Sequence, residues 1–198
     1  MSLDNYRIIA LEDLLSCENG EDIFHKAAQN FSCPLNEDVE HFLKQTALTN
    51  QRMGISRTSL IYTNDKPEPL LLGYYSLALQ VLDLSNISSK TMRKKITGFK
   101  RENKLGAAIY LIGQIGKNYN QQANLLITGK EIFMLAMQDI LDARSNVGGR
   151  IVVVECKNEE HLRNFYANTL KFQLIDNNGD ESMLTYMTLI SAYDPSTL

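Results

Sequence analysis

The chain has 198 residues, a formal net charge of -3 at pH 7 and 44% hydrophobic residues. This length suits one large domain, or one domain with an insertion, and it is enough to bury a core without disulfides. The acidic balance argues against non-specific binding of nucleic acid by the whole molecule. The first residues form no apolar signal segment, and no apolar run is long enough to cross a bilayer as a helix. We therefore expect a cytoplasmic protein with no membrane partner.

Cysteines are too few and too scattered for a disulfide framework, so we expect reduced thiols. One regular pattern invites a metal interpretation, because Cys17, His25, Cys33 and His41 fall at intervals of eight. Zinc ligands usually occur as pairs about two to five residues apart, and no such pair is present. We expect no metal site. Cys156 has no partner histidine in the sequence, so a packed thiol is favoured over a nucleophile.

The first half of the chain predicts strands separated by helices. One or two short helices, interrupted by Gly20, fit residues 14–31. Asn36 is a good N-cap for the next helix, and the acidic residues at the start of this helix interact favourably with its dipole. The helix is expected to end near residues 50–54. Apolar runs indicate strands at Tyr6–Leu11, Ser56–Tyr62 and Leu70–Leu82, the last with a bulge at Gly73.

Residues 85–104 break this pattern. Seven of these twenty residues are basic and only Glu102 is acidic. We expect an exposed, partly helical insertion between two strands. The basic residues are either a solvated loop or a docking surface for RNA phosphates or an acidic protein. The residues of this surface are Lys90, Arg93, Lys94, Lys95, Lys100 and Arg101.

The second half of the chain alternates strands with helices. A polar turn at residues 176–180 joins the last two strands as a hairpin. This order predicts an α/β (α+β) fold in a single domain, with a mixed sheet covered by helices on both faces. The strands are expected at Ala107–Ile115, Ile151–Val154, Phe172–Ile175 and Ser182–Ile190, and the helices at Gly129–Arg144 and Asn158–Leu170.

The link between residues 116 and 131 is a candidate phosphate-binding site. A helix start presents unpaired backbone N–H groups and the positive end of the helix dipole, and Gly129 lets a ligand approach the backbone. Lys117 and Lys130 add positive charge. An ordinary strand-to-helix connection is the alternative. No loop ending in Gly-Lys-Ser/Thr is present, which disfavours nucleotide hydrolysis.

Two stretches resemble the GNAT acetyltransferase superfamily. The helix ending in Phe165-Tyr166, followed by Lys171-Phe172, is similar to that family's helix ending in Phe-Tyr and its following Gly-Phe strand. Residues 124–129 lie where the family has Gln or Arg, two residues, Gly, one residue, then Gly or Ala, and only Gly129 is kept. The element order is also the family's. Residues 72–77 and the insertion after them resemble the subgroup that includes acetyltransferase toxins of toxin–antitoxin pairs.

The resemblance implies a GNAT-like, mostly antiparallel sheet of about six to seven strands and an N-acetyltransferase that uses acetyl-CoA. Strands 107–115 and 151–154 are then expected to part and admit the cofactor's pantetheine arm. Asn158 also suits a helix N-cap, which is the role we favour for it. The residues expected to bind the cofactor are Gln114, Ile115, Gly116, Lys117, Ile127, Thr128, Gly129, Lys130, Asn158 and Phe165.

Tyr166 is the expected catalytic acid. A phenol with a pKa of about 10 is a neutral donor at pH 7 and can protonate a leaving thiolate. The alternative is a core aromatic residue packed with Phe165. No general base stands out in the sequence, and His25, His41 and His161 are expected to be surface or half-buried helix residues and not catalysts.

The acceptor is an amine, and its identity stays open at this stage. Toxin relatives acetylate the amine of aminoacyl-tRNA, and the basic insertion fits that substrate. The alternatives are a small molecule or a protein amine, or a GNAT fold that has lost acetyl-CoA and serves only for interaction. A homodimer is also left open.

Overall fold

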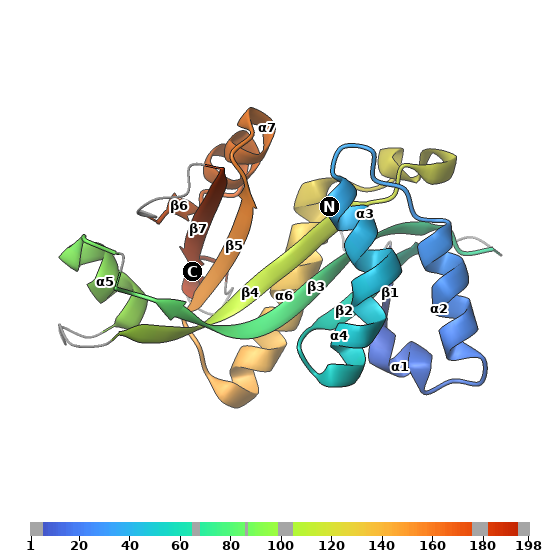
Figure 1. The fold of residues 1–198 in the computed structure, drawn as a ribbon, viewed down its shortest axis with the longest axis horizontal. Helices are drawn as coiled ribbons and strands as arrows, with labels where there is room; N and C mark the ends of the chain where they lie inside the picture. Colours follow the sequence, from blue (N-terminus) through green and yellow to red (C-terminus); the bar gives the residue numbers. More distant parts are fainter. Residues whose placement is uncertain (1–5, 65–67, 86, 99–104, 176–181, 194–198) are drawn as a thin grey trace. The chain divides into compact units, whose positions relative to one another are not determined.

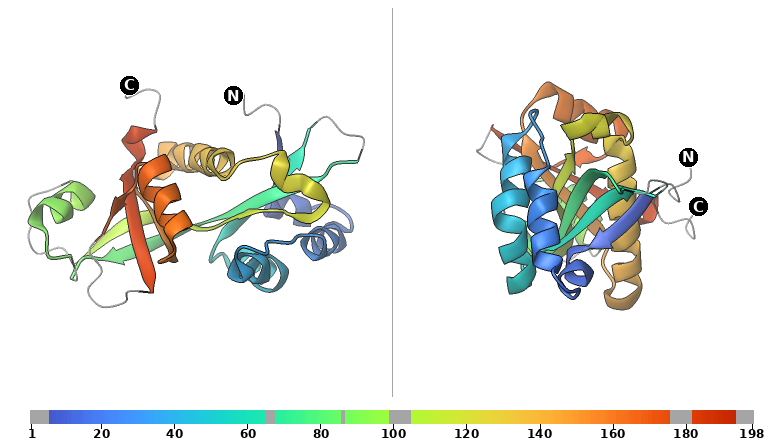
Figure 2. Two further views of the ribbon diagram at one scale, coloured as in Figure 1. Left: turned by 90° about the horizontal axis from the view of Figure 1, so that it is seen from above. Right: turned by 90° about the vertical axis from the view of Figure 1, so that its right-hand side faces the viewer.

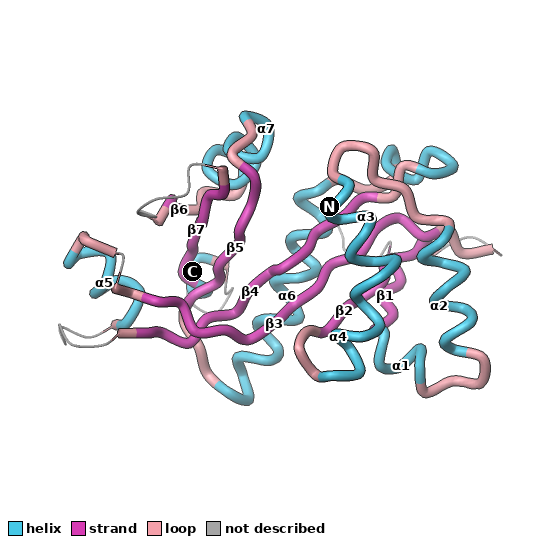
Figure 3. The backbone as a smooth tube through the Cα atoms, viewed as in Figure 1, coloured by secondary structure: helices cyan, strands magenta, loops and turns pink. Residues whose placement is uncertain are grey.

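The computed structural model describes residues 6–64, 68–85, 87–98, 105–175 and 182–193. Helices and strands alternate in the predicted order (Figure 1, Figure 3). The described strands are β1 (Tyr6–Ala10), β2 (Arg57–Thr63), β3 (Leu71–Asp83), β4 (Gly106–Lys117), β5 (Ile151–Lys157), β6 (Gln173–Leu174) and β7 (Met183–Leu189). The described α-helices are α1 (Leu11–Leu15), α2 (Gly20–Gln29), α3 (Glu37–His41), α4 (Ala47–Met53), α5 (Lys90–Thr97), α6 (Gly129–Val147) and α7 (Glu160–Arg163).

The strands form a seven-stranded sheet in the order β1-β2-β3-β4-β5-β7-β6. β4 and β5 are parallel, whereas the pairs β1/β2, β2/β3, β5/β7 and β6/β7 are antiparallel. The prediction of a mixed, mostly antiparallel sheet of this size is therefore confirmed. The predicted turn at residues 176–180 lies outside the described residues, but the β6–β7 hairpin on either side of it is present.

The chain divides into two compact units, Met1–Ala78 with Gly113–Ala136 and Leu79–Ile112 with Met137–Leu198. In the first unit, α1–α4 pack against one face of β1–β3 (Figure 2). Leu60 and Tyr74 are directly opposite each other on β2 and β3, and both join this core. Apolar side chains spaced along the helices complete it, as the helical periodicity predicted. They include Leu11, Leu14, Phe24, Ala28, Val39 and Leu43.

The first turns of α6 cover the other face of the same strands. A Cβ atom on Gly73 would lie 2.9 Å from Cδ1 of Ile132 and 2.4 Å from the carbonyl oxygen of Gly116, so only glycine fits there. The predicted bulge is next to this glycine. Ile61 pairs with Gly73 while Tyr62 pairs with Leu71, which leaves the intervening residue of β3 unpaired. Helices on both faces of the sheet are thus present in this unit.

The second unit has its own apolar core on β4, β5 and β7. Ile109, Ile151, Val153 and Met187 are almost completely buried there. The predicted insertion also contributes to this core, because Ile96 on α5 is 2% exposed. The insertion is partly helical, as expected, and Lys94 and Lys95 on α5 are exposed, while its few apolar side chains pack inward.

Helix ends follow the local signals. The Asn36 side chain accepts a hydrogen bond of 3.1 Å from the backbone N–H of Asp38, as expected of an N-cap. Gly54 ends α4 with a φ of 69°, a left-handed conformation that glycine adopts without strain. No helix in the described part of the chain is long and apolar enough to span a membrane.

Candidate functional site

The carboxyl end of β4 holds the first group of predicted cofactor residues. The strand continues through Gln114, Ile115 and Gly116 to Lys117, two residues beyond the predicted end. A Cβ atom on Gly116 would lie 2.5 Å from Cγ1 of Val39, so glycine is needed there for α3 to pack closely on the strand. The space beside Gly116 is therefore filled by the core, so at this residue only the backbone could contact a ligand.

The ladder between β4 and β5 is short. It consists of the pairs Tyr110–Val152 and Leu111–Val153. Both strands are fully described, and both continue beyond these pairs, β4 to Lys117 and β5 to Lys157, without further pairing to each other. The described ladder therefore consists of two residue pairs, and the parting of the strands around a pantetheine arm stays a prediction.

The connection from β4 to α6 is more ordered than the predicted polar loop. Residues Asn120–Leu125 form a 3-10 segment in which Gln121 and Gln122 have φ values of 52° and 60°. Such left-handed conformations are unfavourable for residues other than glycine and persist only where neighbouring contacts hold them.

Asn118 fixes the start of this segment. Its side chain is 2% exposed, and its Nδ2 donates to the carbonyl oxygen of Leu71 at 2.9 Å. Its Oδ1 accepts from the backbone N–H groups of Ser32 and Asn120, each at 3.0 Å. One buried amide thus joins the end of β4 to β3 and to the segment between α2 and α3.

The N-terminus of α6 carries a capping box. The Thr128 hydroxyl accepts from the backbone N–H of Glu131 at 3.2 Å, and the Glu131 carboxylate accepts from the backbone N–H of Thr128 at 2.8 Å. The Tyr6 hydroxyl on β1 donates to the same carboxylate at 2.9 Å. A carboxylate therefore already lies where the helix dipole favours an anion.

These contacts change the pKa values of Glu131 and Tyr6. Burial raises the pKa of Glu131, but the hydrogen bonds from Thr128 and Tyr6 outweigh it, so the net pKa is lower than usual. Burial and the hydrogen bond to Glu131 raise the pKa of Tyr6 to about 12. Glu131 is thus a stable anion at neutral pH.

The remaining predicted residues of this link differ in what they can offer a ligand. Ile127 is 2% exposed, so its side chain belongs to the core. Gly129 is the first residue of α6, as predicted, and Lys130 is exposed on its first turn. Lys117 lies over the ring of Tyr119, with Nζ 5.6 Å from the ring centroid.

Tyr166 lies in the second unit, in a π-helical segment, Asn164–Thr169, that continues α7. Its ring is 9% exposed and packs against Phe165, Phe172 and Tyr186, with centroids 5.1, 6.1 and 5.9 Å away. π-helical turns inside helices occur often at functional sites. The aromatic packing that we considered as an alternative role is therefore present.

The Tyr166 hydroxyl differs from the ring. It makes no hydrogen bond to any residue that the structure describes, and it is not sealed from solvent. Burial, with a smaller contribution from Cys156, raises its pKa above the usual value, so the phenol keeps its proton at neutral pH. A buried tyrosine normally pairs its hydroxyl, so the lack of a partner among the described residues is unusual.

Asn158 does not cap α7. The N-cap is Glu159, which has no side-chain capping bond, and the Asn158 side chain instead accepts a hydrogen bond from Arg163. The expectation failed because the helix begins one residue later than its sequence indicates. Cys156 is 7% exposed, and burial and Glu159 raise its pKa to about 11, so it is a packed thiol as predicted.

The three histidines lie on helix surfaces, as expected. His25 is next to Glu21 and His161 is next to Glu159, at 3.6 and 3.4 Å, and all three side chains are exposed. Within the described residues, no three His, Cys, Asp or Glu side chains are grouped to hold a metal ion.

The basic surface is partly described. α5 carries Lys90, Arg93, Lys94 and Lys95, and the Ser89 side chain caps it by accepting from the N–H of Met92 at 3.2 Å. Lys95 donates to the Gln173 side chain at 2.8 Å. The other predicted members, Lys100 and Arg101, lie outside the described residues.

Sequence reasoning missed three residues of the first unit. Glu131 could have been found, because Thr128-x-x-Glu131 is a capping-box pattern directly before an apolar helix. Tyr6 and Asn118 had no such signal, since their partners are 125 and 47 residues away in the chain.

No family model matches the sequence, and the search of curated proteins gave no match. Solved structures do match. A tyrosine-to-phenylalanine mutant of KacT superposes with a TM-score of 0.67 at 21% identity, over 96% of this chain and 97% of the other. AtaTR bound with acetyl-CoA gives 0.67 at 20% identity over 96% of both chains. AtaT complexed with acetyl-methionyl-tRNAfMet gives 0.64 at 22% identity, over 91% and 93%. The chain thus has a GNAT-like fold, which it shares with the KacT and AtaT toxins.

Proposed function

We propose that this chain is an N-acetyltransferase that moves an acetyl group from acetyl-CoA to an amine. The observation that carries the proposal is the short β4–β5 ladder, because it leaves backbone groups of β4 beyond Leu111 without partners on β5. The proteins that share the fold support it, since one was solved with acetyl-CoA and another with an acetylated aminoacyl-tRNA. The units also interleave along the chain, which supports one acetyltransferase-like domain.

In the proposed reaction, the neutral amine attacks the thioester carbonyl carbon, the C–S bond breaks, and the amine proton passes to solvent. Backbone N–H groups near Ile115 and Gly116 support the carbonyl oxygen as it gains charge. Tyr166 gives its proton to the leaving thiolate, because its hydroxyl is neutral and has no hydrogen-bond partner among the described residues. We assign the cofactor's phosphates to backbone groups of residues 127–130 with Lys117 and Lys130, and further contacts to Gln114, Asn158 and Phe165.

The acceptor that we favour is the amine of an aminoacyl-tRNA. α5 presents four basic residues, and phosphate contacts dominate the affinity of proteins for RNA. Reversing the charge of Lys94 and Lys95 should reduce acetylation of aminoacyl-tRNA at least tenfold while leaving acetylation of a free amino acid amide unchanged. Equal tRNA acetylation by this variant and the wild type would sink the assignment. A small-molecule or protein amine is then the acceptor.

A second candidate function has its own support. The Glu131 carboxylate occupies the anion-favouring end of α6, which opposes phosphate binding and suits a fold used only for interaction. Calorimetry with acetyl-CoA separates the two functions, because an enzyme must bind it and an interaction protein need not. A cytoplasmic location fits the proposed enzyme, and a homodimer stays a prediction for sedimentation to test.

A further inference from the structure

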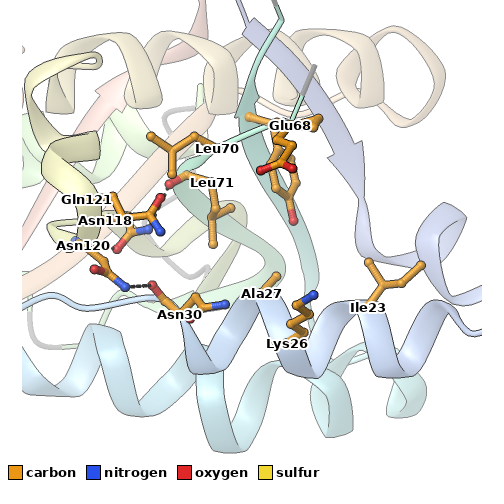
Figure 4. Close-up of a pocket in the computed structure, with 12 residues that line it drawn as sticks. Ile23, Lys26, Ala27, Asn30, Glu68, Leu70, Leu71, Asn118, Asn120 and Gln121 are labelled. Atoms are coloured by element: carbon orange, nitrogen blue, oxygen red, sulfur yellow. Dashed lines mark hydrogen bonds between the residues drawn. The ribbon is translucent and has the colours of Figure 1, made fainter. Parts of the chain in front are cut away.

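A pocket of about 430 Å³ lies in the first unit, formed by residues that the proposed acetyl transfer does not use (Figure 4). Three segments far apart in the chain line it: α2, residues 68–71 at the start of β3, and residues 118–121 after β4. Its volume is in the range of small-molecule sites in proteins.

The base of the pocket is apolar and held in place. Leu71 is 5% exposed, and Ala27 and Tyr62 pack against the core of the unit. Asn118 forms part of the wall, and its amide is fixed by the carbonyl oxygen of Leu71. A ligand would therefore meet a preformed surface, with little ordering cost.

The rim carries one cation and one anion. Lys26 lies on α2 and Glu68 on the β2–β3 connection, on opposite sides of the pocket in Figure 4. Neither side chain has an ion pair or hydrogen bond with any described residue. The hydroxyl of Tyr62 and the side-chain amide of Gln121, which also line the pocket, likewise make no hydrogen bond with any described residue.

These charges select the kind of ligand. A nucleotide or another polyanion would gain from Lys26 but be repelled by Glu68, and a simple amine would meet the reverse. A zwitterion gains from both. The apolar base between the charges then suits an aliphatic side chain, and the Gln121 amide at the rim suits a peptide bond.

We propose that this pocket binds a zwitterion of dipeptide size. Its ammonium pairs with Glu68, its carboxylate pairs with Lys26, and its aliphatic side chain lies on Leu71 and Ala27. This binding is independent of acetyl transfer and does not require the proposed function.

Titration calorimetry without acetyl-CoA tests the proposal, with alanyl-leucine as the probe. N-acetyl-alanyl-leucine lacks the ammonium, and alanyl-leucine amide lacks the carboxylate, so each should bind about 5- to 10-fold more weakly. Absence of alanyl-leucine binding, or equal binding of the three compounds, overturns the proposal.

Variants assign the two charges. Lys26→Gln should weaken alanyl-leucine but leave its amide unchanged, and Glu68→Gln should weaken alanyl-leucine but leave the N-acetyl compound unchanged. Both side chains are exposed, so the fold should be kept, as circular dichroism can check. Asp22→Asn, an exposed change on α2 outside the pocket, is the matched control and should bind as wild type. The proposal would also be overturned if both pocket variants bound alanyl-leucine, its amide and its N-acetyl form with the same relative affinities as wild type.

Discussion

The backbone N–H of Thr128 donates a 2.8 Å hydrogen bond to the side-chain carboxylate of Glu131, three residues later at the start of α6. This bond occupies a backbone N–H that could otherwise donate to a phosphate group, and it places a negative charge at the N-terminus of the helix. The Glu131 carboxylate therefore competes with the cofactor's phosphates for the N-terminus of α6.

Replacing Glu131 by Gln should strengthen the binding of coenzyme A. The charge at the helix N-terminus is lost, while the Gln side chain can still cap, so we expect about a 2- to 5-fold lower Kd at low salt. Calorimetry measures the change, and pantetheine, which lacks the phosphates, is the control ligand and should show none. Weaker coenzyme A binding by the variant would contradict the competition.

Thr128→Ala should destabilise the fold by about 1 kcal/mol, the usual cost of losing an N-cap side chain. Thr128→Ser keeps the hydroxyl that accepts from the N–H of Glu131, and it should be close to wild type. Urea unfolding of both variants gives the comparison. An equal loss of stability in both variants would mean that the Thr128 methyl group, and not the capping hydroxyl, stabilises the fold.

Tyr166→Phe should leave stability within about 0.5 kcal/mol of wild type, because the missing hydroxyl has no hydrogen-bond partner among the described residues. The rate of acetyl transfer should fall by about 10²-fold or more, as expected when a general acid is removed. Thermal unfolding and release of free coenzyme A thiol are the two measurements. Unchanged turnover would remove Tyr166 from the mechanism.

Cys156 should make stability depend on alkaline pH. Its folded pKa of about 11 is raised from an ordinary value of 9.0, so the folded state resists ionising the thiol. The resulting stability is complete below pH 9 and is lost as the pH rises towards about 11. Unfolding experiments across this range should show less loss for Cys156→Ala than for wild type. Identical profiles would argue against the buried thiol.

Asn118→Ala should cost about 2–4 kcal/mol, because it leaves buried groups of Ser32 and Leu71 without hydrogen bonds. Asn118→Asp keeps the acceptor for the N–H of Ser32, and its protonated carboxyl can donate to the carbonyl oxygen of Leu71. It should therefore be less damaging at a pH low enough to protonate the new carboxyl. Chemical unfolding distinguishes the two. A neutral alanine variant would show that the connection after β4 is not held by this amide.

Local patterns in the sequence determined most of the element order. The Asn36 cap, the end of α4 at Gly54 and the start of α6 at Gly129 each depend on residues within a turn of one another, so they can be read without knowing the fold. The mixed sheet with helices on both faces could also be predicted from the sequence, because apolar periodicity indicates which side of each helix or strand is buried.

Only the tertiary structure decided which polar groups are already paired. Tyr6 reaches Glu131 and Asn118 reaches Leu71 because folding brings distant strands and helices together. The same holds for Lys26 and Glu68 at one pocket, and for the Tyr166 hydroxyl, which has no hydrogen-bond partner among the described residues of its aromatic cluster. A sequence names the groups that can bind, but hydrogen bonds form between atoms within about 3 Å, and only the fold sets those distances.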